Sequence, residues 1–342
     1  MTMKKSILPI CILLCGMSYQ ALAQNTSNFH LLKSFDIKGD GGWDYLTVEE
    51  GNKLIYVSHG DQVNIIKEET GDSVGVIKNT NGVHGIGLVK ALNKGYTTNG
   101  RSNNCTVFDL KNNEVMGTVV VGTNPDAILY DDYSKKIFVF NGRSNDASVI
   151  DPTTDKMIAT IPLGGKPETG VSDGKGQIFV NVEDTNEVVV FDANTFKVKY
   201  RYKINDGDEP SGLALDRITH RLFIGCGGNQ TLVVMDATNG KNIAHFPIGN
   251  CDGVAFDPIY KMAYASNGNG FISMLKEKDA NTFELLKNIP TEAGARTIAI
   301  DTKTHHIFTS TAKSTPVAPT AENAHPRPKL IPGTFHVLDI GN

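Results

Sequence analysis

Short apolar runs separated by turn residues recur along the chain, and the stretch from residue 123 to 164 shows the pattern most clearly. Its four runs are Ala127–Tyr130, Ile137–Phe140, Ala147–Ile150 and Met157–Leu163, separated by Asp131-Asp132, Asn141-Gly142 and Asp151-Pro152. Runs this short, rich in Val, Ile, Phe and Tyr and bounded by Gly, Asn, Asp and Pro, are typical of β-strands. They are nearly continuous rather than alternating, which indicates strands that are covered on both faces.

The same four-run pattern repeats along the chain at intervals of 40 to 44 residues. The residues that lead into the first run of each repeat are Asp44, His84, Asp126, Glu168, Ser211, Asp252 and Arg296. A four-strand repeat near this period indicates a β-propeller, in which each blade buries its faces against its neighbours. We therefore predict an all-β fold, a seven-bladed β-propeller with four-stranded blades.

The last repeat is one strand short, and the N-terminal part of the chain can complete it. Its runs are Thr297–Ile300, His306–Thr309 and Thr334–Ile340, while Phe29–Ile37 precedes the first repeat. We predict that this N-terminal strand forms the outer strand of blade seven and closes the ring.

Blade seven also carries a long insertion between its second and third strands. Residues 312–333 include Pro316, Pro319, Pro326, Pro328 and Pro332. A long insertion in a compact domain is typically functional or disordered, and prolines make it stiff. We expect residues 318–328 to lean over the channel mouth and to be more mobile than the strands.

The first 23 residues have the features of a secretory signal peptide. Lys4 and Lys5 precede an apolar stretch that ends at Met17, and Ala21-Leu22-Ala23 forms an A-x-A cleavage site. Cys15 suggests a lipoprotein, but the preceding Leu14 is too large for the usual small-residue position. We predict cleavage after Ala23, a single propeller domain over residues 24–342, and a periplasmic or secreted protein with no transmembrane segment.

Three cysteines remain after cleavage: Cys105, Cys226 and Cys251. An odd number excludes a complete internal disulfide framework. Cys226 ends the second strand of blade five and Cys251 leads into blade six, so we expect both on the same face of adjacent blades. They either form a disulfide or serve as two small buried hydrophobic residues.

Composition and motifs exclude several classes of function. The chain has 33 basic and 37 acidic residues, and loss of Lys4 and Lys5 leaves a net charge of −6. A negative protein without aromatic residues among basic ones lacks the features of nucleic-acid binding. H-x-x-x-H, C-x-x-C, G-x-S-x-G and P-loop motifs are absent.

Propeller geometry gathers the polar residues of the repeat on one face, because the start of the first strand and the turn after the second strand lie at the same end. Asn-Gly-Arg-Ser-Asn occurs at 99–103 and again at 141–145, which places Arg101 and Arg143 side by side. The simpler interpretation is that each arginine pairs locally, for example with Asp146, or lies in solvent. The candidate ligand-binding residues are Asp44, His84, Arg101, Asp126, Arg143, Glu168, Asp252 and Arg296.

Four carboxylates around one channel mouth repel each other unless a cation, a proton or Arg296 compensates them. We expect Arg296 to reach Asp252 or Asp44. Ca²⁺ or another divalent metal suits such oxygen ligands, and no other cofactor is expected. The two arginines suit a phosphate or a carboxylate.

Three hypotheses for function follow. The first is a monomeric, non-catalytic protein that binds a small polar or anionic ligand, or a protein partner, at the channel mouth. The second is a metal-assisted hydrolase or lyase with Glu168, Asp126 or Asp252 as ligand or base and His84 as proton carrier. The third is a structural or host-contact surface protein.

Several strings in the chain resemble one known family. They are FVFNGRSNDASVIDPTTDKMIATIPLGGKPE, VNVEDTNEVVVFD, EPSGLALD, GARTIAIDTKTHHIF and PTAENAHPRPKLIPGTFHVLDIG. They resemble the exported YVTN-repeat, YncE-like seven-bladed propellers over essentially the whole mature chain. The resemblance implies a bacterial periplasmic or secreted protein. Lactonase-type propellers are related more distantly, by fold, and their metal ligands do not map onto this chain residue by residue.

Overall fold

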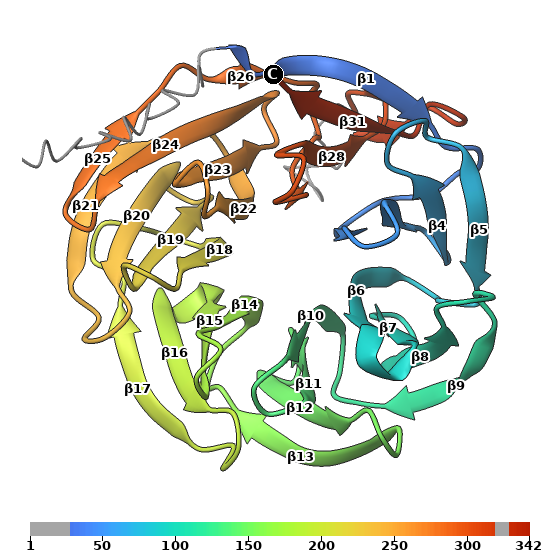
Figure 1. Cartoon of the computed structure of the whole chain (residues 1–342), viewed down its shortest axis with the longest axis horizontal. Coiled ribbons are helices and arrows are strands. Elements are labelled where there is room, and N and C mark those ends of the chain that lie inside the picture. The colour runs from blue at the N-terminus through green and yellow to red at the C-terminus, as the bar shows by residue number, and fades with distance from the viewer. Residues whose placement is uncertain (1–27, 319–327) are drawn as a thin grey trace, which may run out of the picture.

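Seven of the sheets are arranged as blades around a central channel (Figure 1). The computed structural model describes residues 28–318 and 328–342, so the predicted signal peptide lies outside the described residues. The chain passes through blades one to six in order, each running from the channel outward. This confirms the predicted all-β fold with seven blades.

The blades share one order of strands, from the innermost to the outermost. Blade one contains β2 (Leu46–Glu49), β3 (Leu54–His59), β4 (Gln62–Lys67) and β5 (Ser73–Lys78), and blade two contains β6 (Val83–Val89), β7 (Lys94–Asn99), β8 (Asn104–Asp109) and β9 (Val115–Val120). Blade three contains β10 (Pro125–Asp131), β11 (Lys136–Asn141), β12 (Asp146–Asp151) and β13 (Lys156–Pro162). Blade four contains β14 (Pro167–Ser172), β15 (Gln177–Val182), β16 (Glu187–Asp192) and β17 (Val198–Lys203), and blade five contains β18 (Pro210–Asp216), β19 (Arg221–Cys226), β20 (Thr231–Asp236) and β21 (Asn242–Pro247). Two short 3₁₀ helices, Lys90–Leu92 and Glu183–Thr185, lie in turns.

The central strands are apolar on both faces because a neighbouring blade covers each face. In blade three, Phe138 pairs with Val149 and Phe140 with Ala147, and all four side chains are buried. Between blades three and four, the ring centroids of Phe138 and Phe191 lie 5.2 Å apart. Burial of one such side chain contributes about 1.5–3 kcal/mol, so the blades stabilise each other.

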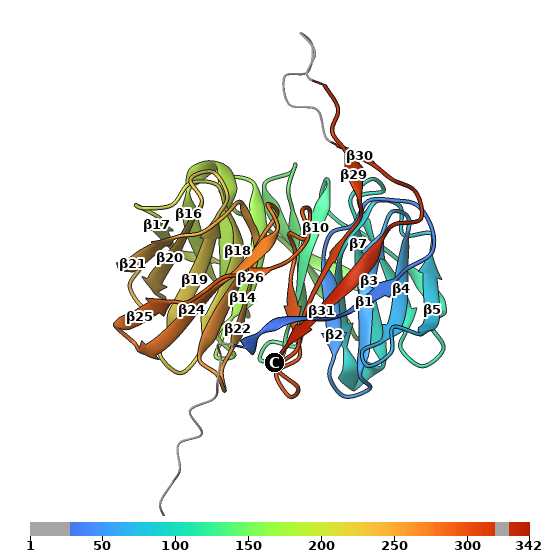
Figure 2. The same ribbon diagram turned by 90° about the horizontal axis from the view of Figure 1, so that it is seen from above.

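The N-terminal strand closes the ring, as predicted. Blade seven has the order β27 (Ala299–Ile300), β28 (Ile307–Thr311), β31 (His336–Gly341) and β1 (His30–Asp36). β1 pairs antiparallel with β31, so the two ends of the described chain share one sheet (Figure 2). The buried residues Phe29, Phe35 and Ile37 anchor this segment.

Blade six departs from the pattern at its outer edge. It contains β22 (Cys251–Asp257), β23 (Met262–Asn267) and an extended β24 (Phe271–Asp279), which pairs with both β25 (Thr282–Leu285) and β26 (Ile289–Pro290). The single outer strand expected for a four-stranded blade is therefore split into two. Pro290 ends the second part and has no backbone N–H to continue a ladder.

The long insertion of blade seven begins and ends in a short ladder of β29 (Ser314–Thr315) with β30 (Lys329–Leu330). Residues 319–327 are not among the described residues. The expected position of the insertion over the channel mouth, and its expected mobility, therefore stay predictions.

All three cysteines of the predicted mature chain are free and buried. Burial raises the pKa of Cys226 to about 12, as expected for an unreactive thiol. Of the two alternatives for Cys226 and Cys251, the structure shows the pair of buried hydrophobic residues.

Within residues 28–318 and 328–342, no helix has the length and hydrophobicity needed to span a bilayer.

Candidate functional site

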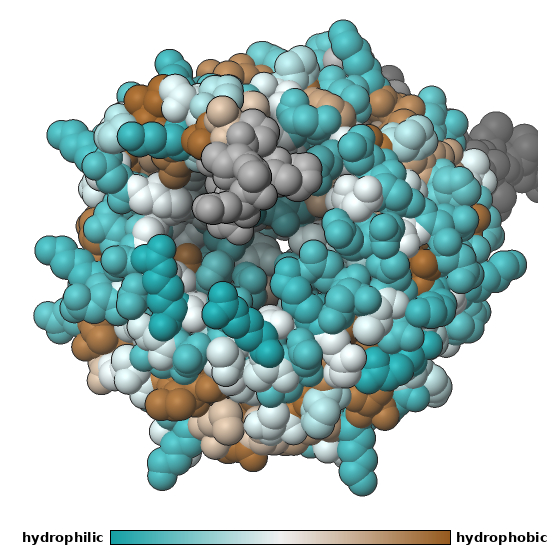
Figure 3. Space-filling view, turned by 180° about the vertical axis from the view of Figure 1, so that it is seen from behind, coloured by the Kyte–Doolittle hydropathy of each residue, from teal (hydrophilic) through white to brown (hydrophobic). Residues whose placement is uncertain are grey.

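One end of the channel opens into a cavity of about 750 Å³. Hydrophilic residues surround the central hollow on this face of the ring (Figure 3). All eight candidate residues from the sequence line the cavity: Asp44, His84, Arg101, Asp126, Arg143, Glu168, Asp252 and Arg296. The structure therefore brings the whole predicted set together, while the role of these residues in binding stays a prediction.

β-Bulges position the ring residues in blades two to six. The register shifts at His84, Asp126, Glu168, Ser211 and Asp252, near the start of each innermost strand. A bulge bends its strand locally and changes the direction of a side chain. The sequence predicted where these residues lie along the chain but not the bulges that hold them.

Polar side chains near the ends of the second strands attach three of the ring residues to the preceding blade. The Thr98 hydroxyl accepts a hydrogen bond from the Gly85 N–H at 2.7 Å and donates to the Asp126 carbonyl. Asn181 Nδ2 donates to the Ser211 carbonyl at 3.1 Å. The Ser266 hydroxyl donates to the Arg296 carbonyl in the same way. These contacts fix the backbone of the ring between adjacent blades.

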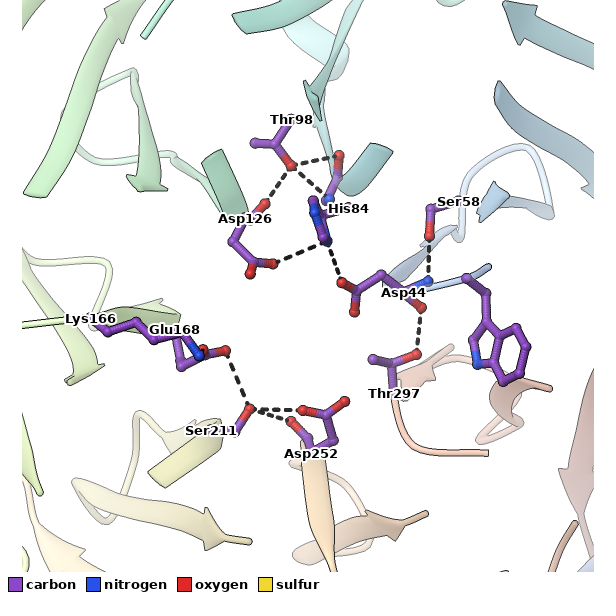
Figure 4. A network of polar contacts seen from close by, with 12 residues as sticks. Asp44, Ser58, His84, Thr98, Asp126, Lys166, Glu168, Ser211, Asp252 and Thr297 are labelled. Atoms are coloured by element: carbon purple, nitrogen blue, oxygen red, sulfur yellow. Dashed lines mark hydrogen bonds and ion pairs between the residues drawn. The ribbon is translucent and has the colours of Figure 1, made fainter. Parts of the chain in front are cut away.

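Asp44, His84 and Asp126 form one side of the ring (Figure 4). His84 Nδ1 lies 2.5 Å from Asp44 Oδ2 and 3.6 Å from Asp126 Oδ1. Burial lowers the pKa of His84, but the hydrogen bond to Asp44 and the charge of Asp126 outweigh burial and raise it. The Asp126 carboxylate is 15% exposed and accepts no hydrogen bond from the described residues. Burial and the Asp44 charge raise its pKa to about 7.

Glu168 and Ser211 continue the ring through blades four and five. The Ser211 hydroxyl lies 3.0 Å from Asp252 Oδ1 and 3.5 Å from Glu168 Oε2. Lys166 Nζ lies 2.7 Å from Glu168 Oε1 and also pairs with Glu183. Burial and the nearby Asp126 raise the pKa of Glu168 to about 9, although Lys166 opposes this shift. Glu168 therefore keeps its proton more readily than Asp126 does.

Arg296 joins the two ends of the ring. Its Nη1 donates to Asp252 Oδ2 at 2.9 Å, and its Nη2 donates to the Trp43 carbonyl at 2.9 Å. Nη2 also lies 4.0 Å from Asp44 Oδ1. We expected Arg296 to reach Asp252 or Asp44, and it bonds to Asp252 and also lies near Asp44. One arginine compensates two of the carboxylates and leaves Asp126 and Glu168 to other partners.

Tyr45 is a residue of the cavity that the sequence patterns did not single out. Its side chain lines the cavity and packs against the apolar cluster of blades three and four, although it belongs to blade one. Burial and the charges of Asp126, Glu168 and Asp44 raise its pKa well above the ordinary value. Its hydroxyl makes no hydrogen bond to any described residue, so it is free to contact a ligand.

A signal for Tyr45 was present in the repeat. The residue after the ring position is small in the other six repeats: Gly85, Ala127, Thr169, Gly212, Gly253 and Thr297. Tyr45 is the exception, and only blade one therefore extends a large side chain from this position.

The two arginines of the repeated Asn-Gly-Arg-Ser-Asn motif lie at the rim. Arg101 Nη1 is 3.5 Å from Asp61 Oδ1, and its side chain is 72% exposed. Arg143 is exposed, and its guanidinium has no partner among the described residues. Asp146, proposed as a local partner for an arginine, instead accepts hydrogen bonds from Asn141 and Ser144.

Several residues at the ends of the second strands, where the repeated Asn-Gly-Arg-Ser-Asn motif begins, have a structural role. Asn99, Asn141 and Asn267 are almost completely buried and bond to polar groups of their own blades. His59 is also buried and stacks on Phe335 at 4.3 Å between ring centroids. The repeated asparagines therefore hold the turns together and do not face the cavity.

Comparison with known proteins supports the fold and leaves the family open. No protein-family model and no curated protein matches the chain. Hydrazine synthase from Kuenenia stuttgartiensis is similar in structure, with a TM-score of 0.70 and 15% identity, over 80% of this chain and 94% of that one.

A chain in the crystal structure of the mitotic checkpoint complex is also similar, with a TM-score of 0.71 and 14% identity, over 82% of this chain and 90% of that one. The chain is a seven-bladed β-propeller. Identities this low establish the fold alone, because unrelated functions share this propeller architecture.

Proposed function

We propose that the chain is an exported binding protein of the YVTN-repeat, YncE-like kind, whose channel-mouth cavity binds a small polar ligand with an anionic group. The observation that carries the proposal is that three polar groups face the cavity without a hydrogen bond to any described residue. They are the Arg143 guanidinium, the Tyr45 hydroxyl and the Asp126 carboxylate. Buried or confined polar groups are normally paired, so unpaired groups that converge on one cavity are available to a ligand.

The chemistry of these groups defines the ligand class. A guanidinium binds a carboxylate or phosphate through two parallel hydrogen bonds. The Tyr45 hydroxyl donates or accepts one hydrogen bond, and Asp126 accepts from a hydroxyl, an ammonium group or a bound cation. A compact molecule with an acid group at one end and donor groups at the other matches this arrangement.

The cavity has the size and rigidity of a small-molecule site. Its volume of about 750 Å³ lies within the range of about 300–1,000 Å³ that is usual for ligand pockets. Lys166 and Arg296 are held by ion pairs, and the backbone of the ring is fixed between blades. Little ordering is then needed when a ligand binds, which favours affinity.

A panel of small carboxylates and phosphates, tested by thermal shift and then by calorimetry, will identify a ligand. We expect Arg143→Ala to weaken binding at least tenfold, since a charge-assisted contact contributes about 1.5–3 kcal/mol. Arg143→Lys will not restore affinity, because the fork of two donors is lost. Arg101→Ala and the double variant measure whether the two arginines act together.

Lys111→Ala, which removes an exposed cation far from the cavity, serves as the control and will leave affinity unchanged. Unchanged affinity in both single arginine variants and in the double variant would remove the arginines from the site.

Export is part of the same proposal and is supported by the sequence of the first 23 residues. Protein purified from the periplasm or medium will begin at Gln24. A mature chain that begins at Met1 or at Cys15 would contradict the proposed cleavage site.

A further inference from the structure

We propose that Asp44, His84 and Asp126 hold one divalent cation of the zinc type at the floor of the cavity. The inference deepens the proposed function and rests on it, because the cation would occupy the same cavity as the ligand. Among the described residues, these three form the one group whose potential metal-ligating atoms all lie within 4.8 Å of each other.

One of the two donor-atom distances is already close to those around a bound metal. His84 Nδ1 lies 2.5 Å from Asp44 Oδ2 and 3.6 Å from Asp126 Oδ1. Zinc binds imidazole nitrogen and carboxylate oxygen at about 2.0–2.2 Å, so donors in one tetrahedral shell are about 3.3–3.5 Å apart. The Asp126 distance fits such a shell, whereas the hydrogen bond between His84 and Asp44 must open by about 1 Å as Nδ1 releases its proton.

The backbone around all three ligands is already fixed. The Asp44 N–H donates to the Ser58 hydroxyl at 2.8 Å, and the Asp44 carbonyl accepts from Thr297 at 2.5 Å. Thr98 bonds to Gly85, next to His84, and to the Asp126 carbonyl. These contacts hold the backbone from which the three ligand side chains extend, so less ordering is needed when a metal binds.

Gly100 leaves room for the His84 ring. A Cβ atom at position 100 would lie 2.6 Å from His84 Nε2, so a larger residue would displace the imidazole. This close backbone approach holds the ring with Nδ1 toward the two carboxylates.

The surrounding charge favours a cation. Apart from the triad itself, Asp252, Glu183 and Glu209 line the cavity, and Arg296 and Lys166 are each already paired with carboxylates. Asp126 has no hydrogen-bond donor among the described residues. The one described partner of this carboxylate is His84 at 3.6 Å, so a cation at the triad would add a second, closer contact.

The donor set selects the type of metal. Imidazole suits zinc and the later transition metals, whereas calcium and magnesium prefer oxygen alone. The calcium expected from the acidic residues is therefore disfavoured by His84. Three protein ligands leave coordination positions toward the cavity, where an anionic ligand held by Arg143 could reach the metal. A metal in this place is also what the alternative hypothesis of a metal-assisted hydrolase requires.

Metal titration of the chelator-treated mature protein, without any organic ligand, tests the site. Calorimetry with ZnCl₂ will show one site per chain, bound at least a hundredfold more tightly than CaCl₂. Asp126→Asn and His84→Gln will each weaken zinc binding at least tenfold while preserving side-chain size. Asp132→Asn and His245→Gln change an exposed acid and an exposed histidine outside the cavity and will leave the affinity within twofold.

If a triad variant does not fold, proton NMR of the Co²⁺-loaded wild-type protein tests the site instead. We expect the shifted signals of one coordinated imidazole. Any one of four results would overturn the proposal. These are absence of zinc binding, tighter binding of calcium than of zinc, unchanged zinc affinity in both triad variants, and Co²⁺ spectra without an imidazole ligand. Binding of the anionic ligand is measured separately, in the presence of a chelator, with the wild-type protein and the Arg143 variants. This measurement tests the proposed ligand site without metal, so failure of the metal site can be told apart from failure of the ligand site.

Discussion

Gly212 shows how closely the innermost strands of neighbouring blades approach each other. It lies in β18, and a Cβ atom there would be 2.6 Å from the backbone nitrogen of Val254 in β22. A backbone neighbour cannot rotate away as the end of a flexible side chain can. A methyl group at this position would therefore push blades five and six apart beside Ser211.

We expect Gly212→Ala to lower the free energy of unfolding by about 1–3 kcal/mol, as is typical of overpacked sites. Gly117→Ala is the matched control, since Gly117 also lies in a strand but a methyl group added there would have no described atom within 4 Å. Gly117→Ala will change the free energy of unfolding by no more than about 0.5 kcal/mol. Urea unfolding of both proteins measures the difference, and equal stabilities would contradict the close packing of the two blades.

β1 is the element that turns an open array of blades into a ring. It supplies the outer strand of blade seven, and without it β31 becomes an unpaired edge. Phe35 is buried, whereas Leu31 on the same strand is 43% exposed. The strand therefore stabilises the molecule both through its ladder and through a few buried side chains.

Deletion of residues 25–38 will lower the free energy of unfolding by more than about 4 kcal/mol, because Phe29, Phe35 and Ile37 lose their burial. Thermal unfolding measures the effect. A truncated protein that melts at the temperature of the intact one would show that ring closure does not stabilise the fold.

Point variants distinguish this effect from poor expression of a truncated chain. Phe35→Ala will cost about 3–5 kcal/mol. Leu31→Ala on the same strand will cost less than about 1 kcal/mol, because Leu31 is largely exposed.

Much of this element-level organisation could be predicted from the sequence, because turn residues and apolar runs repeat with a nearly constant period. The closing strand could be predicted by counting the apolar runs in each repeat, because blade seven has three runs where the other blades have four. The bulges could not be predicted, because a bulge depends on the register of two strands and leaves no fixed residue type. The roles of Asn99 and Asn141 were also hidden, since the same residues suit an exposed turn and a buried hydrogen-bond network.

At the scale of the whole molecule, buried carboxyl groups make stability depend on pH. Glu277 is fully buried and burial raises its pKa to about 7, and the pKa of Glu68 is raised to about 7 by burial and by Asp301. The pKa values of Asp126 and Glu168 in the cavity are raised as well. Between the unfolded and folded pKa values, the native state binds more protons than the unfolded state, so stability falls as pH rises.

We expect the free energy of unfolding to be higher near pH 5 than near pH 8. Each buried group contributes a difference on the order of 1–3 kcal/mol, fully present below its unfolded pKa and lost as pH rises through about 7. Glu277→Gln will reduce this slope, while Glu284→Gln on the exposed surface will leave it unchanged. Urea unfolding of all three proteins between pH 5 and pH 8 measures this dependence. A free energy of unfolding that does not change with pH in the parent protein would contradict the protonated state of these groups.

The central claim is that the channel mouth binds a small anionic ligand. The most direct measurement is a high-resolution crystal structure of protein purified from its native host without added ligand. We predict density in the cavity with an acid group against Arg143 and a donor group or cation against Asp126. Ordered water alone in the cavity, with a ligand or partner bound on another face of the ring, would contradict the claim.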